Sequence, residues 1–358
     1  VCAVPAVLLA LLVCVALART VAAANIRLLT SRKGRDLAVL SGLVIAVGIQ
    51  VVNFSAQRLG VVGGLAKLDQ VADVVRWIPP ASALGAIDSV SDGAYGTAAA
   101  ESTGDRPRRT SGLARLVPDG RTGTVMERTL RYVWRDPKTK AAWVTSLAVG
   151  LIVPVFHAMQ SQGSVYFACF ASGMLGIQMY NQFGQDTSAF WTIVTTVTSP
   201  RDALLELHGR ALALALITVP YASLVTIATT VLVGAWHSLP EVLGLSFALL
   251  GALLATGAWS SARFPYSIPR EGYKNVAPGQ GGLAMISIFG GMVASALLCS
   301  PLIGLTIWLH TSDMTDLTWL ILPLGLGYGA AVAVAGLRTA APVVAGRLPE
   351  ILMAVDKG

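Results

Sequence analysis

Long apolar runs separated by polar connections dominate the pattern of this chain. A helix needs roughly 20 apolar residues to cross a hydrocarbon core about 30 Å thick. None of the 26 basic and 19 acidic residues falls inside the runs that reach or approach this length. The pattern predicts an all-α, polytopic membrane protein with about eight spans. These spans are Val1–Ala18, Leu37–Val52, Ala141–Met159, Ser164–Tyr180, Ala211–Gly234, Val242–Trp259, Leu283–Leu309 and Leu317–Leu337.

The basic residues fall in alternate connections between these spans. From residue 101 onward, the connections that contain Lys or Arg are 101–140, 181–210, 260–282 and 338–358. Those without either residue are 160–163, 235–241 and 310–316. Because Lys and Arg favour the cytoplasmic side of a membrane, six spans follow residue 140 and the C-terminus is expected in the cytoplasm.

The first 100 residues fit this alternation less simply. Two basic stretches, 19–36 and 101–140, both read as cytoplasmic, but only Leu37–Val52 lies between them as a clear span. A span missing near residue 100 is the favoured explanation; a re-entrant segment and a failure of the orientation rule stay open. The chain begins inside an apolar run, which indicates an N-terminal truncation rather than a signal peptide.

Three units follow from these patterns. Residues 1–100 read as the tail of a preceding membrane unit, with two spans and a polar segment. Residues 101–123, rich in Ser, Thr, Gly, Pro and Arg, read as a flexible basic linker. Residues 124–358 form the predicted six-span unit, with a surface helix before it and a cytoplasmic C-terminal segment after it.

Composition narrows the class of protein. Hydrophobic residues make up 54% of the chain and charged residues 13%, and the mean hydropathy is +0.66. Soluble domains carry about 25% charged residues, so a soluble enzyme and a disordered chain are excluded. The four cysteines, none in a C-x-x-C pair, lie inside apolar runs, and neither a zinc site nor a disulfide is expected. The net charge of +7 reads as the cytoplasmic Lys/Arg bias, not as a nucleic-acid partner.

The spans carry little that suggests chemistry of their own. No Asp or Glu falls within any span, and Glu241 only borders one. His157 lies near the outer end of its span, where a packing or capping role is favoured over a proton relay. The chain has no G-x-x-x-x-G-K-[ST] phosphate loop and no catalytic motif. We therefore expect no enzyme activity and no cofactor in this chain, so that any energy for transport enters through a partner.

An amphipathic helix is predicted over residues 125–136, before the six-span unit. Met126, Leu130, Val133 and Trp134 recur on one side, at spacings typical of a helix. The interleaved arginines suit the headgroup boundary of a membrane, and Pro137 separates this helix from the next span. A simple basic lead-in is the alternative. The candidate residues are Arg128, Arg131, Trp134, Arg135, Asp136 and Pro137.

The connection 181–210 is the second candidate contact region. Its aromatic residues, together with Asp186 and Thr187, predict a short half-buried helix at the cytoplasmic surface. Ser199 as N-cap, Pro200 as first residue and Asp202 in a near capping box predict a new helix that continues through Arg210. A purely structural loop is an equal alternative. The candidate residues are Asn181, Phe183, Gly184, Asp186, Phe190, Trp191, Pro200 and Arg201.

These motifs resemble a known family. Arg131-Tyr-Val-Trp-Arg-Asp-Pro137, Asn181-Gln-Phe-Gly-Gln-Asp186, Ala189-Phe-Trp191 and Ser199-Pro-Arg201 are similar to segments of the permease subunit of ABC-2 type (type V) ABC exporters. The bacterial permeases of antibiotic and multidrug export are the most similar group. Weaker support comes from Phe264-Pro-Tyr-Ser-Ile-Pro269 and Arg347-Leu-Pro-Glu-Ile-Leu352. The resemblance covers residues 120–358 well and residues 1–100 loosely.

The resemblance implies a permease in the bacterial cell membrane, assembled with a separate subunit that binds ATP and Mg. The helix at 125–136 would be the connecting helix, and the loop at 181–201 would supply the coupling helix that docks on the ATPase. The expected cargo is a small lipophilic or amphiphilic compound, because the spans carry no fixed charge. Changing Asp186 or Trp191 to Ala is expected to uncouple ATP hydrolysis from transport.

Small residues recur within two of the predicted spans. Gly290-Gly291 with Ala294, and Gly325, Gly327 and Gly329 with Ala331 and Ala333, are expected to let helices pack closely, with a hinge as the alternative. Two functions other than an export permease stay open. A membrane scaffold without transport activity is the second hypothesis. An intramembrane enzyme that acts on lipids is the third and weakest, and its candidate residues are Arg263, Arg270, Glu271, Tyr273 and Lys274.

Overall fold

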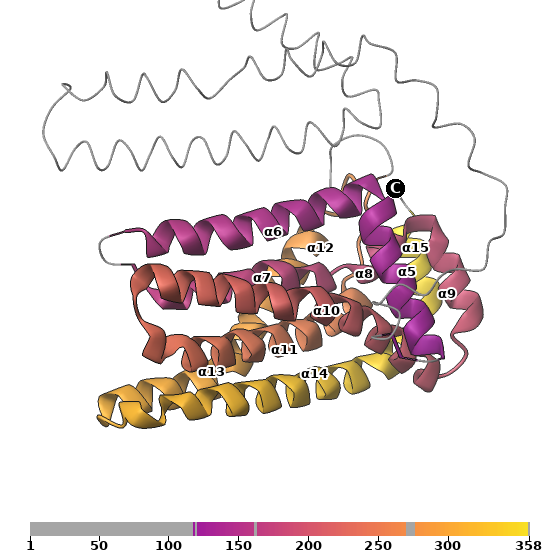
Figure 1. Cartoon of the computed structure of the whole chain (residues 1–358). Coiled ribbons are helices and arrows are strands. Elements are labelled where there is room, and N and C mark those ends of the chain that lie inside the picture. The colour runs from indigo at the N-terminus through magenta and orange to yellow at the C-terminus, as the bar shows by residue number, and fades with distance from the viewer. Residues whose placement is uncertain (1–116, 119, 161–162, 270–275, 357–358) are drawn as a thin grey trace, which may run out of the picture. The chain divides into compact units, whose positions relative to one another are not determined.

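The apolar segments after residue 140 form helices that run side by side in a computed structural model of the chain (Figure 1). The structure describes residues 117–118, 120–160, 163–269 and 276–356. Within these ranges the regular elements are helices and none is a strand, which confirms the predicted all-α class. The expected spans Val1–Ala18 and Leu37–Val52 and the region around residue 100 lie outside the described residues.

Five helical stretches are long and apolar enough to cross a membrane. They are Lys138–Ala158, Pro200–Val233, Trp236–Arg263, Gly281–Thr311 and Thr315–Gly346. The remaining expected span, Ser164–Tyr180, corresponds to a shorter apolar helical stretch, Val165–Met179. The described part of the chain is therefore a polytopic helical membrane protein, and its number of crossings depends on this shorter stretch.

The helices fall into three groups. The first group lies at one end of the long helices, and we call its members the surface helices: α5 (Arg121–Arg135), α8 (Gln182–Asp186), η5 (Thr187–Phe190), α9 (Trp191–Thr196) and α15 (Leu348–Val355). The long helices are α6 (Pro137–Ala158), α10 (Pro200–Val233), α11 (Leu239–Arg263), α13 (Gly291–Thr311) and α14 (Ile321–Gly346). Shorter pieces connect them: η3 (Val165–Ala168), α7 (Cys169–Gly176), η4 (Ile177–Met179), η6 (Trp236–Ser238), α12 (Gly281–Met285), the π-helix η7 (Ile286–Gly290) and η8 (Thr315–Leu320).

Helix α10 begins where the sequence predicts. The Ser199 hydroxyl accepts a hydrogen bond from the Asp202 backbone N–H, and the Asp202 side chain accepts one from the Ser199 backbone N–H. Pro200 is the first helical residue, and the helix continues past Arg210 to Val233. The capping box fixes the start of α10 because it satisfies backbone donors that have no partner within the helix.

Changing Ser199 to Ala is expected to lower the free energy of unfolding by about 1 kcal/mol, because it removes the acceptor for the Asp202 N–H. Thermal unfolding of the purified protein measures this loss. Ser223→Ala on the same helix is the control, because its hydroxyl donates only to the Val219 carbonyl within the helix. Equal stabilities of the two variants would contradict the capping role.

The seam between α11 and α14 depends on glycine. A Cβ atom on Gly251 would collide with the backbone of Gly329, and one on Gly325 would collide with the backbone of Gly244. Small residues let membrane helices approach closely in this way, and the expectation for Gly325 and Gly329 agrees with the structure. Gly327 and Gly290, by contrast, have no atom of another described segment near the position of a Cβ, so the predicted close packing at these two glycines is wrong for the described helices.

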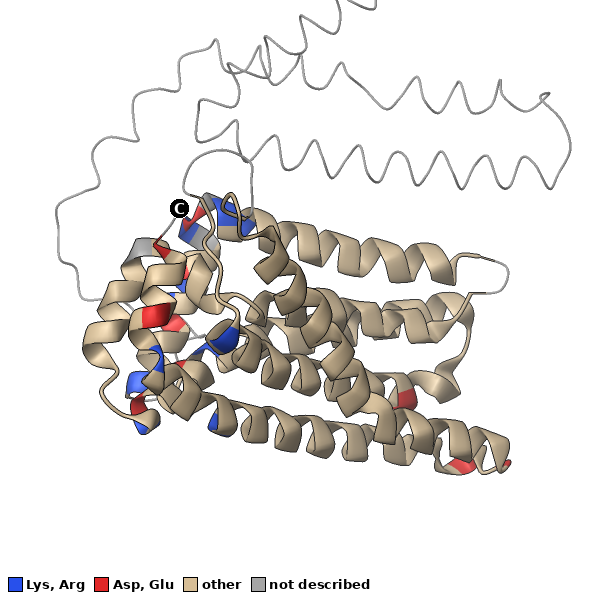
Figure 2. Ribbon diagram, turned by 180° about the vertical axis from the view of Figure 1, so that it is seen from behind, with Lys and Arg blue, Asp and Glu red and all other residues tan. Residues whose placement is uncertain are grey.

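The two ends of the helices differ in charge. Figure 2 shows the described Lys and Arg residues at the end that carries the short surface helices. At the opposite end the described charged residues are acidic: Glu241 at the start of α11, and Asp313 and Asp316 between α13 and α14. We call these the basic end and the acidic end. This distribution agrees with the alternation of charge along the sequence.

Candidate functional site

A buried set of charged side chains lies at the basic end, between α8 and α10. Asp186 is the last residue of α8, while Glu206 and Arg210 stand one turn apart on α10. The Arg210 guanidinium forms ion pairs with both carboxylates, and its Nη2 lies 2.9 Å from Glu206 Oε1. Arg128 of α5 reaches Glu206 from the other side. We call these four residues the charge network.

The network is neutral and closely hydrogen-bonded. Two guanidinium groups balance two carboxylates, and the side chains of Asp186, Glu206 and Arg210 are each no more than 3% exposed. Arg210 Nε donates to Glu206 Oε1 over 2.9 Å, and its Nη1 donates to the Gln182 carbonyl oxygen over 2.8 Å. The guanidinium carbon also lies 5.2 Å from the centre of the Phe183 ring. Such complete pairing offsets the cost of removing charges from water.

Burial raises the pKa of Asp186, and the guanidinium groups of Arg210 and Arg128 oppose that shift. The carboxylate therefore depends on Arg210 to remain ionised in a place that disfavours charge. The network holds α8 to α10 by an interaction that is costly to break, because an unpaired buried charge is much less stable than a paired one.

The amide of Asn181 connects α8 to the segment after α11. Its Nδ2 donates to the Tyr266 carbonyl oxygen over 2.9 Å, and its Oδ1 accepts from the Tyr266 N–H over 3.3 Å. A Cβ atom on Gly184 would collide with the Tyr266 carbonyl, so only glycine allows this close approach. The predicted motifs at 181–186 and 264–269 thus meet in space, although about 80 residues separate them.

The C-terminal helix α15 is hydrogen-bonded to the same part of the chain, between α11 and α12. Ser267 Oγ donates to the Val355 carbonyl oxygen over 2.8 Å, and Gln280 Nε2 donates to the Ala354 carbonyl oxygen over 3.1 Å. Phe183 and Phe190 are fully buried, with ring centres 5.2 Å apart, in a core that also contains Ile351. The surface helices therefore share one hydrophobic core with the long helices.

The predicted connecting helix is α5, but it begins at Arg121, inside the stretch expected to be linker. Val125 and Met126 are buried, and Gly209 of α10 lies so close to Val125 that a Cβ there would clash. The sequence predicted that the apolar side of this helix lies in the headgroup boundary of the membrane. Much of that side instead packs against α10 of the same chain. The reason is that Gly209 leaves room for α5 against α10.

The other candidate residues of this helix have local roles. Arg131 pairs with Glu127 one turn away, and Arg135 is exposed in the last turn of α5. Trp134 also lies in the last turn. Asp136 caps the next helix, since its carboxylate accepts from the Thr139 N–H over 2.7 Å. Pro137 separates α5 from the following long helix as predicted, and it is itself the first residue of that helix, α6.

The candidate contact residues of the 181–201 region divide into two groups. Asn181, Phe183, Gly184, Asp186 and Phe190 are buried and bind other parts of this chain. Trp191, Pro200 and Arg201 are exposed, and the Trp191 side chain is 58% exposed. Direct contact with another protein is open only to the second group in this conformation. The expected short half-buried helix corresponds to α8, η5 and α9.

Sequence reasoning missed Glu206 and Arg210, which it placed in a cytoplasmic connection. The signal that could have found them is their spacing of four residues near the start of the predicted helix, since an acid followed by a base at that spacing pairs on one face. Their partners, Asp186 and Arg128, are 24 and 78 residues away from them along the chain. No local pattern specifies such pairing.

Among the described residues, no group of three or more His, Cys, Asp or Glu side chains is arranged to hold a metal ion. Of the lipid-enzyme candidates, residues 270–275 lie outside the described residues. No family model, curated protein or solved structure matches the chain.

Proposed function

We propose that this chain is the membrane permease subunit of an ATP-driven exporter of the ABC-2 type, with a separate subunit that binds and hydrolyses ATP. The resemblance of its motifs to that family suggests the assignment. The observation that carries it is the charge network, because it links α8, which leads through η5 into the exposed Trp191 of α9, to a long apolar helix. Such a link is what a permease needs in order to convert the movement of a partner into movement of its spans.

Movement of α8 and α9 would pass directly to the long helices. Asp186 connects α8 to Arg210 on α10, and Asn181 connects the start of α8 to Tyr266, just after α11. Breaking the first connection would leave buried charges unpaired, at a cost of about 3–5 kcal/mol. The surface helices and the long helices are therefore expected to move as one unit when a partner displaces the surface.

The surface proposed to receive the ATP-binding subunit is formed by Trp191, Pro200 and Arg201. Tryptophan and arginine are enriched among the residues that contribute most to protein interfaces. The surface lies at the basic end (Figure 2). The Lys/Arg bias supports a cytoplasmic location for this end, where ATP is available. In this proposal the C-terminus is cytoplasmic and the membrane is the bacterial cell membrane.

Changing Trp191 to Ala is expected to weaken binding of the ATP-binding subunit about 30-fold, since loss of an aromatic anchor costs about 2 kcal/mol. The measurement uses the full chain in lipid nanodiscs and the purified ATP-binding subunit encoded beside its gene. Coupling of ATP hydrolysis to transport is the second readout. Trp319→Ala is the matched control, because Trp319 is 55% exposed but lies at the acidic end, in η8.

Two results would count against the proposal. Equal binding by Trp191→Ala and the unchanged chain would remove the docking surface. If the ATP-binding subunit does not bind the unchanged chain, and loss of the gene does not alter resistance to toxic compounds, the alternative of a membrane scaffold without transport activity is favoured.

A further inference from the structure

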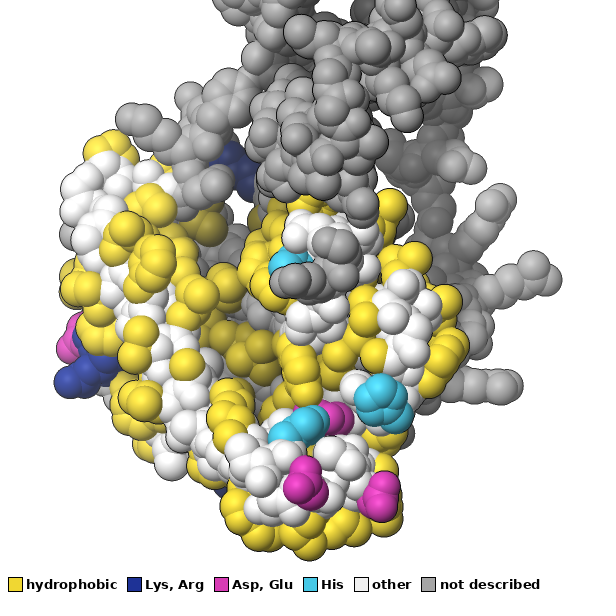
Figure 3. All heavy atoms as spheres, turned by 90° about the vertical axis from the view of Figure 1, so that its left-hand side faces the viewer, with side chains coloured by type: hydrophobic (Ala, Val, Ile, Leu, Met, Phe, Trp, Pro, Cys, Tyr) yellow, Lys and Arg dark blue, Asp and Glu magenta, His cyan; other side chains and the backbone are white. Residues whose placement is uncertain are grey.

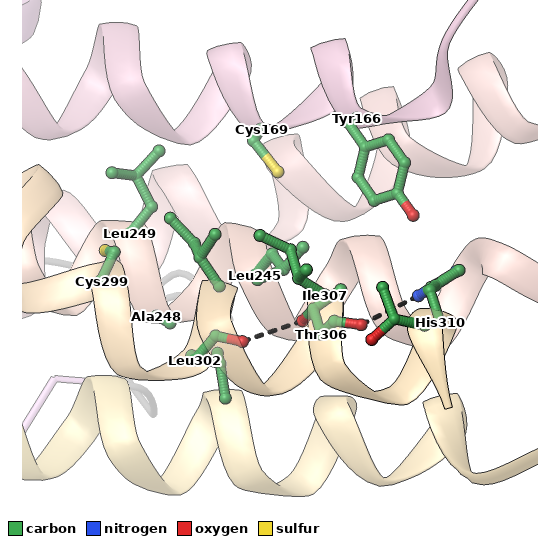
Figure 4. Close-up of a pocket in the computed structure, with 12 residues that line it drawn as sticks. Tyr166, Cys169, Leu245, Ala248, Leu249, Cys299, Leu302, Thr306, Ile307 and His310 are labelled. Atoms are coloured by element: carbon green, nitrogen blue, oxygen red, sulfur yellow. Dashed lines mark hydrogen bonds between the residues drawn. The ribbon is translucent and has the colours of Figure 1, made fainter. Parts of the chain in front are cut away.

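A cavity of about 480 Å³ lies toward the acidic end, between η3, α7, α11 and α13 (Figure 4). Its size falls within the range of about 300–1,000 Å³ that is usual for small-molecule sites. Its wall is mainly apolar, with Leu245, Leu249, Leu302 and Ile307 among the lining residues. Polar groups are confined mostly to one side, where Tyr166 and His310 line it.

A buried carboxylate lies behind this polar side. Glu241, in the first turn of α11, accepts a hydrogen bond from the Tyr166 hydroxyl over 2.7 Å. Its second oxygen is 3.7 Å from Nε2 of His310, at the end of α13, and its side chain is 2% exposed. Both neighbours of the carboxylate thus line the cavity, although about 70 residues separate each of them from Glu241 in sequence.

Glu241 has no permanently charged partner within residues 163–269 and 276–356. Its one ion pair there is with His310, which is charged only when protonated, whereas Asp186 and Glu206 are paired with arginines. The described Lys and Arg lie at the other end of the helices (Figure 2). The N-terminal position on α11 stabilises the carboxylate by about 0.3–1 kcal/mol, less than the several kcal/mol that burial of a charge costs. A cation near this carboxylate would offset part of that cost.

The surface around the cavity has the same character. The acidic end carries Asp, Glu and His side chains surrounded by hydrophobic ones (Figure 3). Tyr166 is 41% exposed, so its ring is accessible, and the face of a tyrosine ring attracts cations. Its hydroxyl donates to Glu241, which places the carboxylate close to the hydroxyl edge of the ring.

We propose that this cavity binds a lipophilic cation, whose apolar body fills the space beside Leu245 and Leu302 and whose positive charge lies at the polar side, next to Tyr166 and His310 and in the field of Glu241 behind them. The inference rests on the proposed function in one respect, since it names a lipophilic cation as the class of cargo. Binding itself requires neither ATP nor a partner, so it can be measured on this chain alone.

The test compares two probes of the same shape and opposite charge, tetraphenylphosphonium and tetraphenylborate. Each is titrated against the full chain in zwitterionic nanodiscs, with empty nanodiscs to subtract uptake by the lipid. The phosphonium is expected to bind at least about 10-fold more tightly than the borate. Equal affinity for the two probes would show an apolar cavity without charge selection and would overturn the proposal.

Two variants locate the charge. Glu241→Gln keeps an acceptor for Tyr166 but removes the charge, and phosphonium binding is expected to fall about 10-fold. Asp316→Asn, which removes an exposed carboxylate at the same end, is the matched control and is expected to bind as the unchanged chain does. His310→Lys leaves Glu241 in place but supplies an internal cation, so it should weaken phosphonium binding to a similar degree.

If Glu241→Gln does not fold, the probe comparison and His310→Lys still decide the question. Phosphonium binding that is unchanged in His310→Lys and in any folded Glu241→Gln protein would overturn the inference. Trp191→Ala, at the far end of the helices, is expected to retain phosphonium binding. Selective binding without attachment of an ATP-binding subunit would therefore overturn the transport proposal alone, and attachment without selective binding would overturn this inference alone.

Discussion

Changing Arg210 to Leu is expected to lower the free energy of unfolding by about 3–5 kcal/mol, because it leaves Asp186 buried without a cation. Arg128 remains to pair with Glu206, so the loss falls mainly on Asp186. Thermal unfolding of the purified full chain in detergent measures the effect. Arg201→Leu, nine residues earlier on α10 and exposed, is the matched control and should change stability by less than about 0.5 kcal/mol.

A double variant separates loss of the ion pair from loss of packing. When Asp186 and Arg210 are both changed to Leu, no unpaired charge remains between α8 and α10, and Glu206 keeps Arg128. We expect the double variant to be more stable than Arg210→Leu alone, since apolar replacements of a buried ion pair are often tolerated. A double variant less stable than the single one would show that these side chains do not act as a pair.

The destabilisation of the Arg210→Leu protein is also expected to become smaller as the pH falls. Burial raises the pKa of Asp186, and loss of Arg210 removes the main opposing effect. At the lower pH the folded state takes up a proton at Asp186 that the unfolded state, with its ordinary pKa of about 3.9, does not. Proton uptake by the folded state favours folding. The double variant lacks this carboxyl group and should not show this pH dependence.

The second large effect is expected at the seam between α11 and α14. Changing Gly251 to Val would place a side chain against the backbone of Gly329. Backbone atoms have no rotamer through which to move away, so the helices must separate, and overpacking of this kind costs about 1–3 kcal/mol or more. The midpoint of thermal unfolding should fall accordingly.

Gly327→Val is the control for the seam, because Gly327 is on α14 but has no atom within 4 Å of the Cβ position. It is expected to unfold at nearly the temperature of the unchanged chain. If the two glycine variants unfold at the same temperature, close contact between α11 and α14 does not contribute to stability as the structure implies.

Several local features could be read from the sequence because they depend on neighbouring residues. The apolar runs predicted the long helices, since their length and lack of charge reflect the thickness of a membrane. Ser199, Pro200 and Asp202 predicted the start of α10, because capping acts within one helical turn, and Pro137 predicted a break before the next long helix. The helices extend beyond the apolar runs, however, so that charged residues such as Glu206 and Arg210 lie within α10.

The burial of the charged side chains could not be read in the same way. The sequence placed Asp186 among candidate contact residues on a half-buried helix, but the structure buries its side chain against Arg210. It placed Glu241 at the border of a span, but the structure encloses it between Tyr166 and His310. Each of these contacts joins separate helices, so its geometry depends on how the helices pack and not on the spacing of residues within one of them.

By itself, then, the sequence determined that this protein is helical and membrane-spanning, where α10 begins, and at which end of the long helices the basic residues lie. The length of an apolar run, the capping of a helix and the Lys/Arg content of a connection each depend on residues that are close together in the sequence. Only the tertiary structure decided which charges are paired, which aromatic residues are exposed, and that an apolar cavity lies beside a buried carboxylate. Pairing and burial arise when distant segments pack together, because only then is water removed from between them.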